Sequence, residues 1–124
     1  MYHNWYATWM RNPILEVNFY STEQENEPVR EWLKSMSALD KKRVGEDIKT
    51  VQFGWPLGMP LVKHLDGDIW EVRVNLSKSI ARVLFVLNKS SMLLIHGFIK
   101  KQRKTLKSDL DLAKDRVKKL RGRS

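Results

Sequence analysis

Residues 68–99 read DIWEVRVNLSKSIARVLFVLNKSSMLLIHGFI, and this stretch decides the fold. Residues 68–76 alternate apolar and polar side chains, which is the period of a strand with one buried face. Residues 80–88 and 91–99 are more evenly apolar, as strands covered on both faces are. The connections LSKS and NKSS have the length of hairpin turns. The stretch therefore predicts an antiparallel three-stranded meander.

The residues before the meander predict a strand and two helices. ILEVNFY, residues 14–20, alternates in the same way and indicates an N-terminal strand. Pro28 suits the first position of a short amphipathic helix. Ser37, with Asp40 three residues later, predicts the start of a second helix that ends near Gly54, and the pair forms a helical hairpin. The expected buried stripes are Val29, Trp32, Leu33 and Met36 in the first helix, and Val44, Ile48 and Val51 in the second.

A final helix completes the predicted domain. Ser108 with Asp111 resembles a helix cap, and an apolar stripe follows at helical spacing: Leu110, Ala113, Val117 and Leu120. The order predicts an α+β fold with N-terminal strand, helical hairpin, three-stranded meander and C-terminal helix, the helices covering one face of the sheet. We expect a single domain over residues 14–121, with an N-terminal extension 1–13 and a tail 122–124.

Composition excludes several classes of protein. The 124 residues suffice for about one domain, and RVLFVLN is far shorter than a transmembrane helix. A secretion signal is not evident, and the chain has no cysteine, which fits a cytoplasmic location and excludes thiol chemistry. Most of the net charge of +9 lies in residues 100–124, which hold 11 Lys and Arg against three Asp and Glu. Such a field favours a polyanionic partner, although a solvated basic helix gives the same count.

Sequence motifs give no support for a cofactor. The histidines His3, His64 and His96 lie far apart, and no metal-ligand spacing is present. A Gly-rich loop between a strand and a helix is also missing, so nucleotide cofactors are not indicated. We therefore expect no metal, no small-molecule cofactor and no membrane partner.

The meander predicts a basic trough. If the turn after residues 68–76 has two or four residues, Arg73 lies directly opposite Arg82, a repulsive pair that a bound anion would explain. The alternative is that each arginine forms an ion pair with a nearby carboxylate, Glu71 or Asp68, in an ordinary surface network. A similar turn after Leu87 would place Gly97 opposite Arg82, leaving room for a ligand, or marking a bulge or bend.

The same face would continue to Lys101, with Lys63 and His64 at its edge. Such a trough suits RNA cleavage, because the 2′-hydroxyl attacks its own phosphate and the protein aligns this attack, stabilises charge and moves protons. Crowding among cations should lower the pKa of a lysine there. His96 is the conventional base, and Phe98 could stack on a nucleobase, but both also fit ordinary core positions.

Several segments in order resemble the phage-derived HigB-like toxins of the RelE/ParE superfamily. They are Pro28-Val29-Arg30-Glu31, LVKHLDGDIWEVRV, IARVLFVL, LLIHGFIKKQRKT and DLAKDR. The resemblance implies a RelE-like fold and the toxin of a type II toxin–antitoxin system, which cleaves mRNA at the ribosomal A site. It also implies a cognate helix-turn-helix-type antitoxin.

The resemblance also implies roles for single residues. Arg73 and Arg82 would hold the scissile phosphate, and Lys100 or Lys101 would stabilise charge or transfer a proton. The expected RNA-binding residues are Lys63, His96, Phe98, Arg103, Lys104 and Thr105. Leu106 stands where related sequences usually have proline, and the aromatic residues of the 1–13 extension have no counterpart. A gyrase-inhibiting ParE-like toxin and a non-toxic RNA-binding module are the alternatives.

Overall fold

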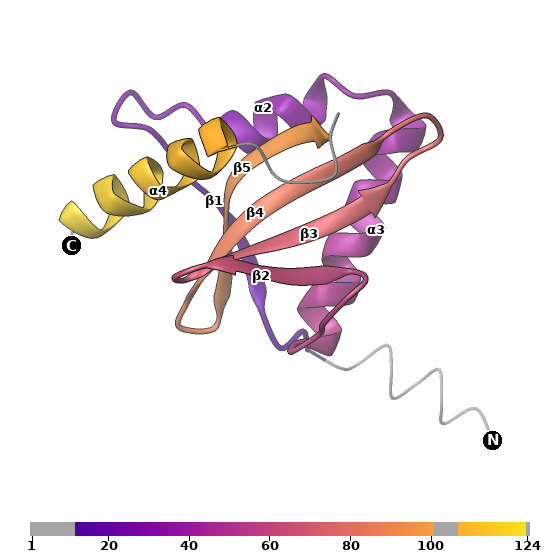
Figure 1. Cartoon of the computed structure of the whole chain (residues 1–124), viewed down its shortest axis with the longest axis horizontal. Coiled ribbons are helices and arrows are strands. Elements are labelled where there is room, and N and C mark those ends of the chain that lie inside the picture. Colours follow the sequence, from indigo (N-terminus) through magenta and orange to yellow (C-terminus); the bar gives the residue numbers. More distant parts are fainter. Residues whose placement is uncertain (1–11, 101–106, 124) are drawn as a thin grey trace.

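The computed structural model describes residues 12–100 and 107–123, which form a five-stranded mixed sheet with helices on both faces (Figure 1). The strand order is β1-β5-β4-β3-β2. β1 (Glu16–Phe19) runs parallel to β5 (Ser91–Lys100), and each neighbouring pair from β2 to β5 is antiparallel. The remaining strands are β2 (Val62–Asp66), β3 (Ile69–Asn75) and β4 (Ile80–Asn88). The predicted α+β class is confirmed.

The meander has four strands, so the prediction of three is wrong. β2 is the additional strand, and it lies at the edge of the sheet. Within it only Val62 is buried, while Lys63, His64 and Asp66 are exposed. An edge strand with one buried side chain lacks the alternation that identifies a strand in a sequence.

The helical hairpin forms as predicted. α2 (Pro28–Lys34) has proline in its first turn and buries Val29. α3 (Ala38–Gly54) begins after Ser37, whose hydroxyl accepts a hydrogen bond from the backbone N–H of Asp40 at 3.2 Å. The cap satisfies one of the free N–H groups of the first turn. The predicted stripe of α3 is buried: Val44, Ile48 and Val51.

The sheet separates two hydrophobic cores, which corrects the prediction of helices over one face only. The first core joins the sheet to α2 and α3 and contains Val44, Phe85 and Leu94. The second joins the other face to α4 (Lys107–Gly122) and contains Leu84 and Val117. β4 and β5 are therefore covered on both faces, as their even apolar pattern predicts.

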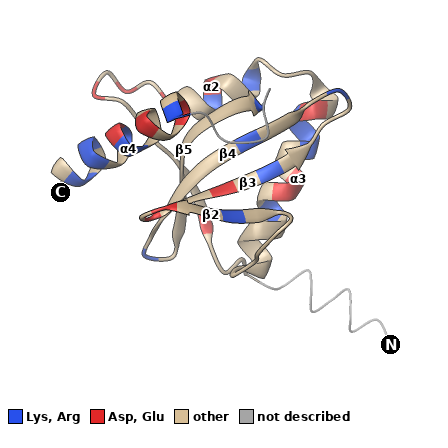
Figure 2. Cartoon of the chain, viewed as in Figure 1, with Lys and Arg blue, Asp and Glu red and all other residues tan. Residues whose placement is uncertain are grey.

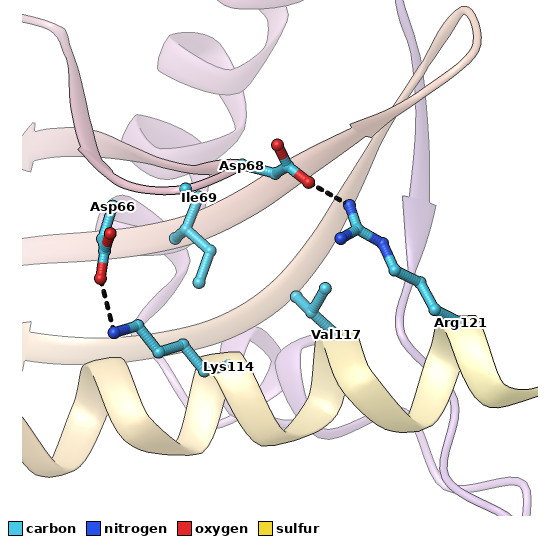
Figure 3. Close-up of a pocket in the computed structure, with 7 residues that line it drawn as sticks. Asp66, Asp68, Ile69, Lys114, Val117 and Arg121 are labelled. Atoms are coloured by element: carbon cyan, nitrogen blue, oxygen red, sulfur yellow. Dashed lines mark hydrogen bonds and ion pairs between the residues drawn. The ribbon is translucent and has the colours of Figure 1, made fainter.

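α4 packs through its expected stripe and is tied to the sheet by ion pairs. Ala113 and Val117 are buried, and Ser108 lies within the helix, so its prediction as the cap is wrong. Asp66 and Asp68 at the β2–β3 turn pair with Lys114 and Arg121, beside a pocket of about 360 Å³ (Figure 3). None of the helices in residues 12–100 and 107–123 combines the length and apolar character needed to cross a membrane.

A β-bulge in β5 sets which side chains lie on the α4 face. Leu84 pairs with His96, but its neighbour Phe85 pairs with Leu94, so Ile95 is an extra residue. Ile95 packs in the second core, and its carbonyl accepts a hydrogen bond from Arg116 Nη1 of α4 at 2.8 Å. The insertion shifts the alternation by one residue beyond Ile95.

The bulge overturns one predicted register and leaves the other intact. Arg73 lies opposite Arg82, as predicted for the four-residue turn 76–79. Arg82, however, pairs with Phe98, and Gly97 pairs with Val83. The prediction of Gly97 beside Arg82 is wrong because it assumed an unbroken period of two.

Gly97 makes room for a helix side chain instead of a ligand. A Cβ at this position would lie 2.3 Å from Cε3 and Cζ3 of Trp32, so the indole of α2 packs directly on the backbone of β5. This contact belongs to the side of the sheet that carries the first core.

We predict that Gly97→Ala lowers the free energy of unfolding by about 1–3 kcal/mol, because the new methyl overlaps the Trp32 ring. Urea denaturation measures this change. Trp32→Leu in the same chain should recover part of the loss. Gly45→Ala is the matched control, since no atom lies within 4 Å of its added Cβ, and alanine should stabilise α3 by up to about 1 kcal/mol. Equal effects at the two glycines would contradict the packing role of Gly97.

Candidate nucleic-acid interface

Basic side chains from four strands gather on the sheet face that carries α4. Arg73 of β3 lies opposite Arg82 of β4, Lys63 of β2 lies opposite Glu71, and Lys100 ends β5 opposite Ile80. Figure 2 shows the basic positions side by side on β2, β3 and β4, with an acidic position on β3. We call this group, Lys63, Glu71, Arg73, Arg82 and Lys100, the basic trough.

A buried carboxylate lies at the centre of the basic trough. Glu71 is 0% exposed, and its Oε2 accepts a hydrogen bond from Arg82 Nη1 at 2.9 Å. Arg73 Nε lies 3.9 Å from the Oε1 atom of the same carboxylate. Glu71 is thus the partner of both arginines, as the ion-pair alternative expected, while Asp68 pairs with Arg121. The negative charge offsets the repulsion between the two guanidinium groups.

The two arginines differ in their access to solvent. The Arg82 side chain is only 2% exposed, whereas the Arg73 side chain is 26% exposed. A phosphate group can therefore reach Arg73 from solvent more readily than Arg82. The buried Arg82 fixes the Glu71 carboxylate beneath this position.

Lys100 is half-buried at the end of β5. Its partial burial, followed by the positive charges of Arg82 and Arg73, lowers the pKa of the Lys100 ammonium below its usual 10.5. Glu71 acts in the opposite direction and Lys63 adds to the lowering. The direction of this pKa shift agrees with that predicted for a lysine among cations, but its first cause is burial and not the neighbouring charges.

Lys63 and His64 lie on opposite faces of the edge strand. Lys63 is exposed and opposite Glu71, at the edge of the basic trough as expected. His64 pairs with Trp70, and their ring centroids are 4.5 Å apart. Its Nε2 donates a hydrogen bond to the Gly67 carbonyl at 2.6 Å. Placing His64 at the edge of the trough is therefore wrong, because successive residues of a strand point to opposite faces.

His96 and Phe98 lie on the α4 face because of the bulge. Their rings stack with centroids 5.2 Å apart, and Phe98 packs against the second core. His96 Nε2 lies 2.8 Å from Asp109 Oδ1 of α4, a hydrogen bond that fixes the ring at the helix. Both residues therefore join β5 to α4, and their proposed contact with RNA stays a prediction.

Other predicted residues fall outside the described part of the chain. Lys101, Arg103, Lys104, Thr105 and Leu106 lie there, as do the aromatic residues Tyr2, Trp5, Tyr6 and Trp9. Among residues 12–100 and 107–123, His, Asp and Glu form no group of three that could hold a metal ion.

Three residues of this region were not assigned to a site from the sequence. Glu71 shares the period-two face of Arg73, so its sequence position could have indicated it. Asp109 pairs with His96 across elements, and Met59 lies 3.9 Å from Arg73 Nη1 through its Sδ atom. Sequence spacing carries no signal for contacts between separate elements.

Comparison with known proteins identifies the family. Residues 31–118 match the model of the family described as phage derived protein Gp49-like (DUF891). The chain belongs to the Gp49-like family. This family is associated with RelE/HigB-like toxins and with toxin–antitoxin systems. A search of curated proteins gave no match. The Gp49-like match extends from α2 into α4 and includes the whole basic trough.

We predict that Arg82→Met lowers the free energy of unfolding of this Gp49-like protein by about 3–5 kcal/mol, because the Glu71 charge stays buried without its closest partner. Glu71→Met in the same chain should recover most of the loss. Lys119→Gln, which removes an exposed pair with Asp115, should cost about 1 kcal/mol or less. Urea denaturation compares the variants. A cost for Arg82→Met no larger than that of Lys119→Gln would refute the central role of this pair.

Proposed function

We propose that this Gp49-like protein is the toxin of a type II toxin–antitoxin system and cleaves mRNA at the ribosomal A site. The observation that carries the proposal is the basic trough, in which Arg73 and Lys100 flank a buried Glu71–Arg82 pair. Family membership supports the toxin assignment. The cognate antitoxin is expected to be of the helix-turn-helix type.

The proposed reaction breaks the RNA backbone without a metal. The 2′-oxygen attacks the adjacent phosphorus, the bond to the 5′-oxygen breaks, and a cyclic phosphate forms. One proton leaves the 2′-hydroxyl and one reaches the departing 5′-oxygen. Arg73 is the group that binds the phosphate and stabilises its developing charge, because guanidinium groups donate two parallel hydrogen bonds to such oxygens.

Arg82 acts as a positioning residue in this scheme. At 2% exposure it holds Glu71, and Glu71 in turn lies beside Arg73. A side chain kept in place before the substrate arrives needs no reorganisation during the reaction. Lys100 is the proposed proton carrier, since a lowered pKa brings its neutral form closer to working pH.

The antitoxin would neutralise the toxin by covering the same trough. Lys63 and the partly exposed Arg73 present positive charge on the surface of the sheet. An acidic or apolar segment fits this surface and excludes RNA, because both ligands need the same cations.

Arg73→Gln and Lys100→Gln should each relieve growth arrest after induction in cells. For Arg73→Gln we expect cleavage to fall by about 10²- to 10³-fold, the effect of removing one preorganised donor. Mapping the 5′ ends of transcripts after brief induction measures the loss. The matched control is Lys49→Gln, an exposed lysine on α3, which covers the opposite face of the sheet and should leave cleavage unchanged.

Melting curves establish that each variant is folded. The proposal fails if the double variant Arg73→Gln/Lys100→Gln stays fully toxic and cleaves as before. Intact transcripts with accumulating DNA breaks would support a gyrase inhibitor. Unaffected growth together with salt-dependent RNA binding would support a binding module.

The pH dependence of cleavage tests the role of Lys100. A proton acceptor works only when neutral, so the single-turnover rate should rise with pH and level off below pH 10.5, the usual pKa of lysine. Lys100→Arg keeps the charge but stays protonated, so it should lose both the rate and this rise. If Lys100→Arg retains the wild-type rate and profile, Lys100 supplies only positive charge.

A further inference from the structure

The segment 55–61 between α3 and β2 ends in a closed turn beside the basic trough. The backbone N–H of Val62 donates to the Gly58 carbonyl at 3.1 Å, and the N–H of Arg73 donates to the Leu61 carbonyl at 2.8 Å. These two bonds fix Met59 where the Arg73 side chain leaves the sheet. Because these backbone hydrogen bonds hold the turn, the Met59 backbone has a defined position relative to Arg73.

Met59 is an apolar side chain held at the surface next to a cation. It is 58% exposed, and its Sδ lies 3.9 Å from Arg73 Nη1. The thioether is polarisable and unbranched, so it adapts to flat apolar and aromatic surfaces.

We infer that Met59 forms a subsite for one nucleobase of the RNA strand whose phosphate Arg73 binds; this inference rests on the function proposed above. A nucleotide carries its base and its phosphate on the same sugar, so a phosphate at Arg73 brings a base next to its neighbours. Proteins read single-stranded RNA by placing unstacked bases against side chains in this way. Lys63 lies exposed on β2 opposite Glu71, on the same face of the sheet as Arg73, and would meet the next phosphate of the RNA strand.

The subsite gives the toxin its base preference. Arg73 and Lys63 bind phosphates, which are the same in every nucleotide and carry no sequence information. Met59 contacts the part of the nucleotide that differs between A, C, G and U. Contact with a larger purine ring covers more of the thioether, so purines should bind better than pyrimidines at this position.

Binding of uncleavable RNA tests the inference directly. The probes are labelled short homopolymers of A, C, G and U with 2′-fluoro groups, which remove the attacking hydroxyl. We expect the wild type to prefer purines, and Met59→Ala to weaken purine binding about fivefold or more and to narrow the differences between bases. Met59→Leu should retain most of the affinity, and Leu39→Ala, an exposed apolar control on α3, should bind like the wild type.

Two results would overturn the inference. One is that Met59→Ala binds all four homopolymers like the wild type while Arg73→Gln weakens all of them. The other is that Met59→Ala loses affinity only for the antitoxin, which would assign Met59 to the protein partner. A wild type that cleaves no transcript would refute the proposed function, and the binding series would still decide whether Met59 contacts a base.

Discussion

One extra residue in β5 determines which side chains of this strand face the basic trough. Without Ile95 as a bulge, the alternation from the β4–β5 turn would place Gly97 on the α4 face and direct His96, Phe98 and Lys100 toward the first core. Lys100 would then lie on the opposite face of the sheet from Arg73 and Arg82. The bulge stands because the second core buries the Ile95 side chain and Arg116 satisfies its carbonyl. The packing of α4 and the placement of Lys100 therefore depend on the same residue.

The Glu71–Arg82 pair explains how two arginines can face each other across the sheet. A buried ion pair is rarely more stable than an apolar pair of similar size, because desolvation offsets the attraction between the charges. Stability alone therefore does not account for this pair. In this arrangement the buried Arg82 holds the Glu71 carboxylate in place, and the partly exposed Arg73 lies beside that carboxylate. This division of exposure suits the proposed binding of an anion, since the ligand would meet a cation that is already held in position.

Features encoded in short stretches of sequence could be predicted. The Ser37 cap, the buried stripe of α3 and the pairing of Arg73 with Arg82 depend on spacing within one helix or across one four-residue turn. Features decided by contacts between distant segments could not. The amphipathic pattern of α4 shows which side of the helix is apolar, but not which face of the sheet it covers. The bulge at Ile95 is invisible in an apolar run, because neighbouring residues are equally suited to either core. The edge strand β2 buries only Val62, so its sequence lacks the alternation of apolar and polar residues that identifies a strand.

The charge distribution has a different meaning in the structure than in the sequence. The excess positive charge lies in residues 100–124, yet Lys63, Arg73 and Arg82 of the trough come from outside that segment. Several cations of α4 serve the fold instead. Lys114 and Arg121 pair with Asp66 and Asp68, and Arg116 binds the bulge carbonyl. An ion pair has no net charge, so Lys114 and Arg121 add little to the long-range field that attracts a polyanion, whereas Arg116 on a neutral carbonyl still adds to it. In the proposed function, the net positive charge of residues 100–124 would favour the approach of RNA. The proposed cleavage would instead depend on a few cations of the meander, which the net charge does not reveal.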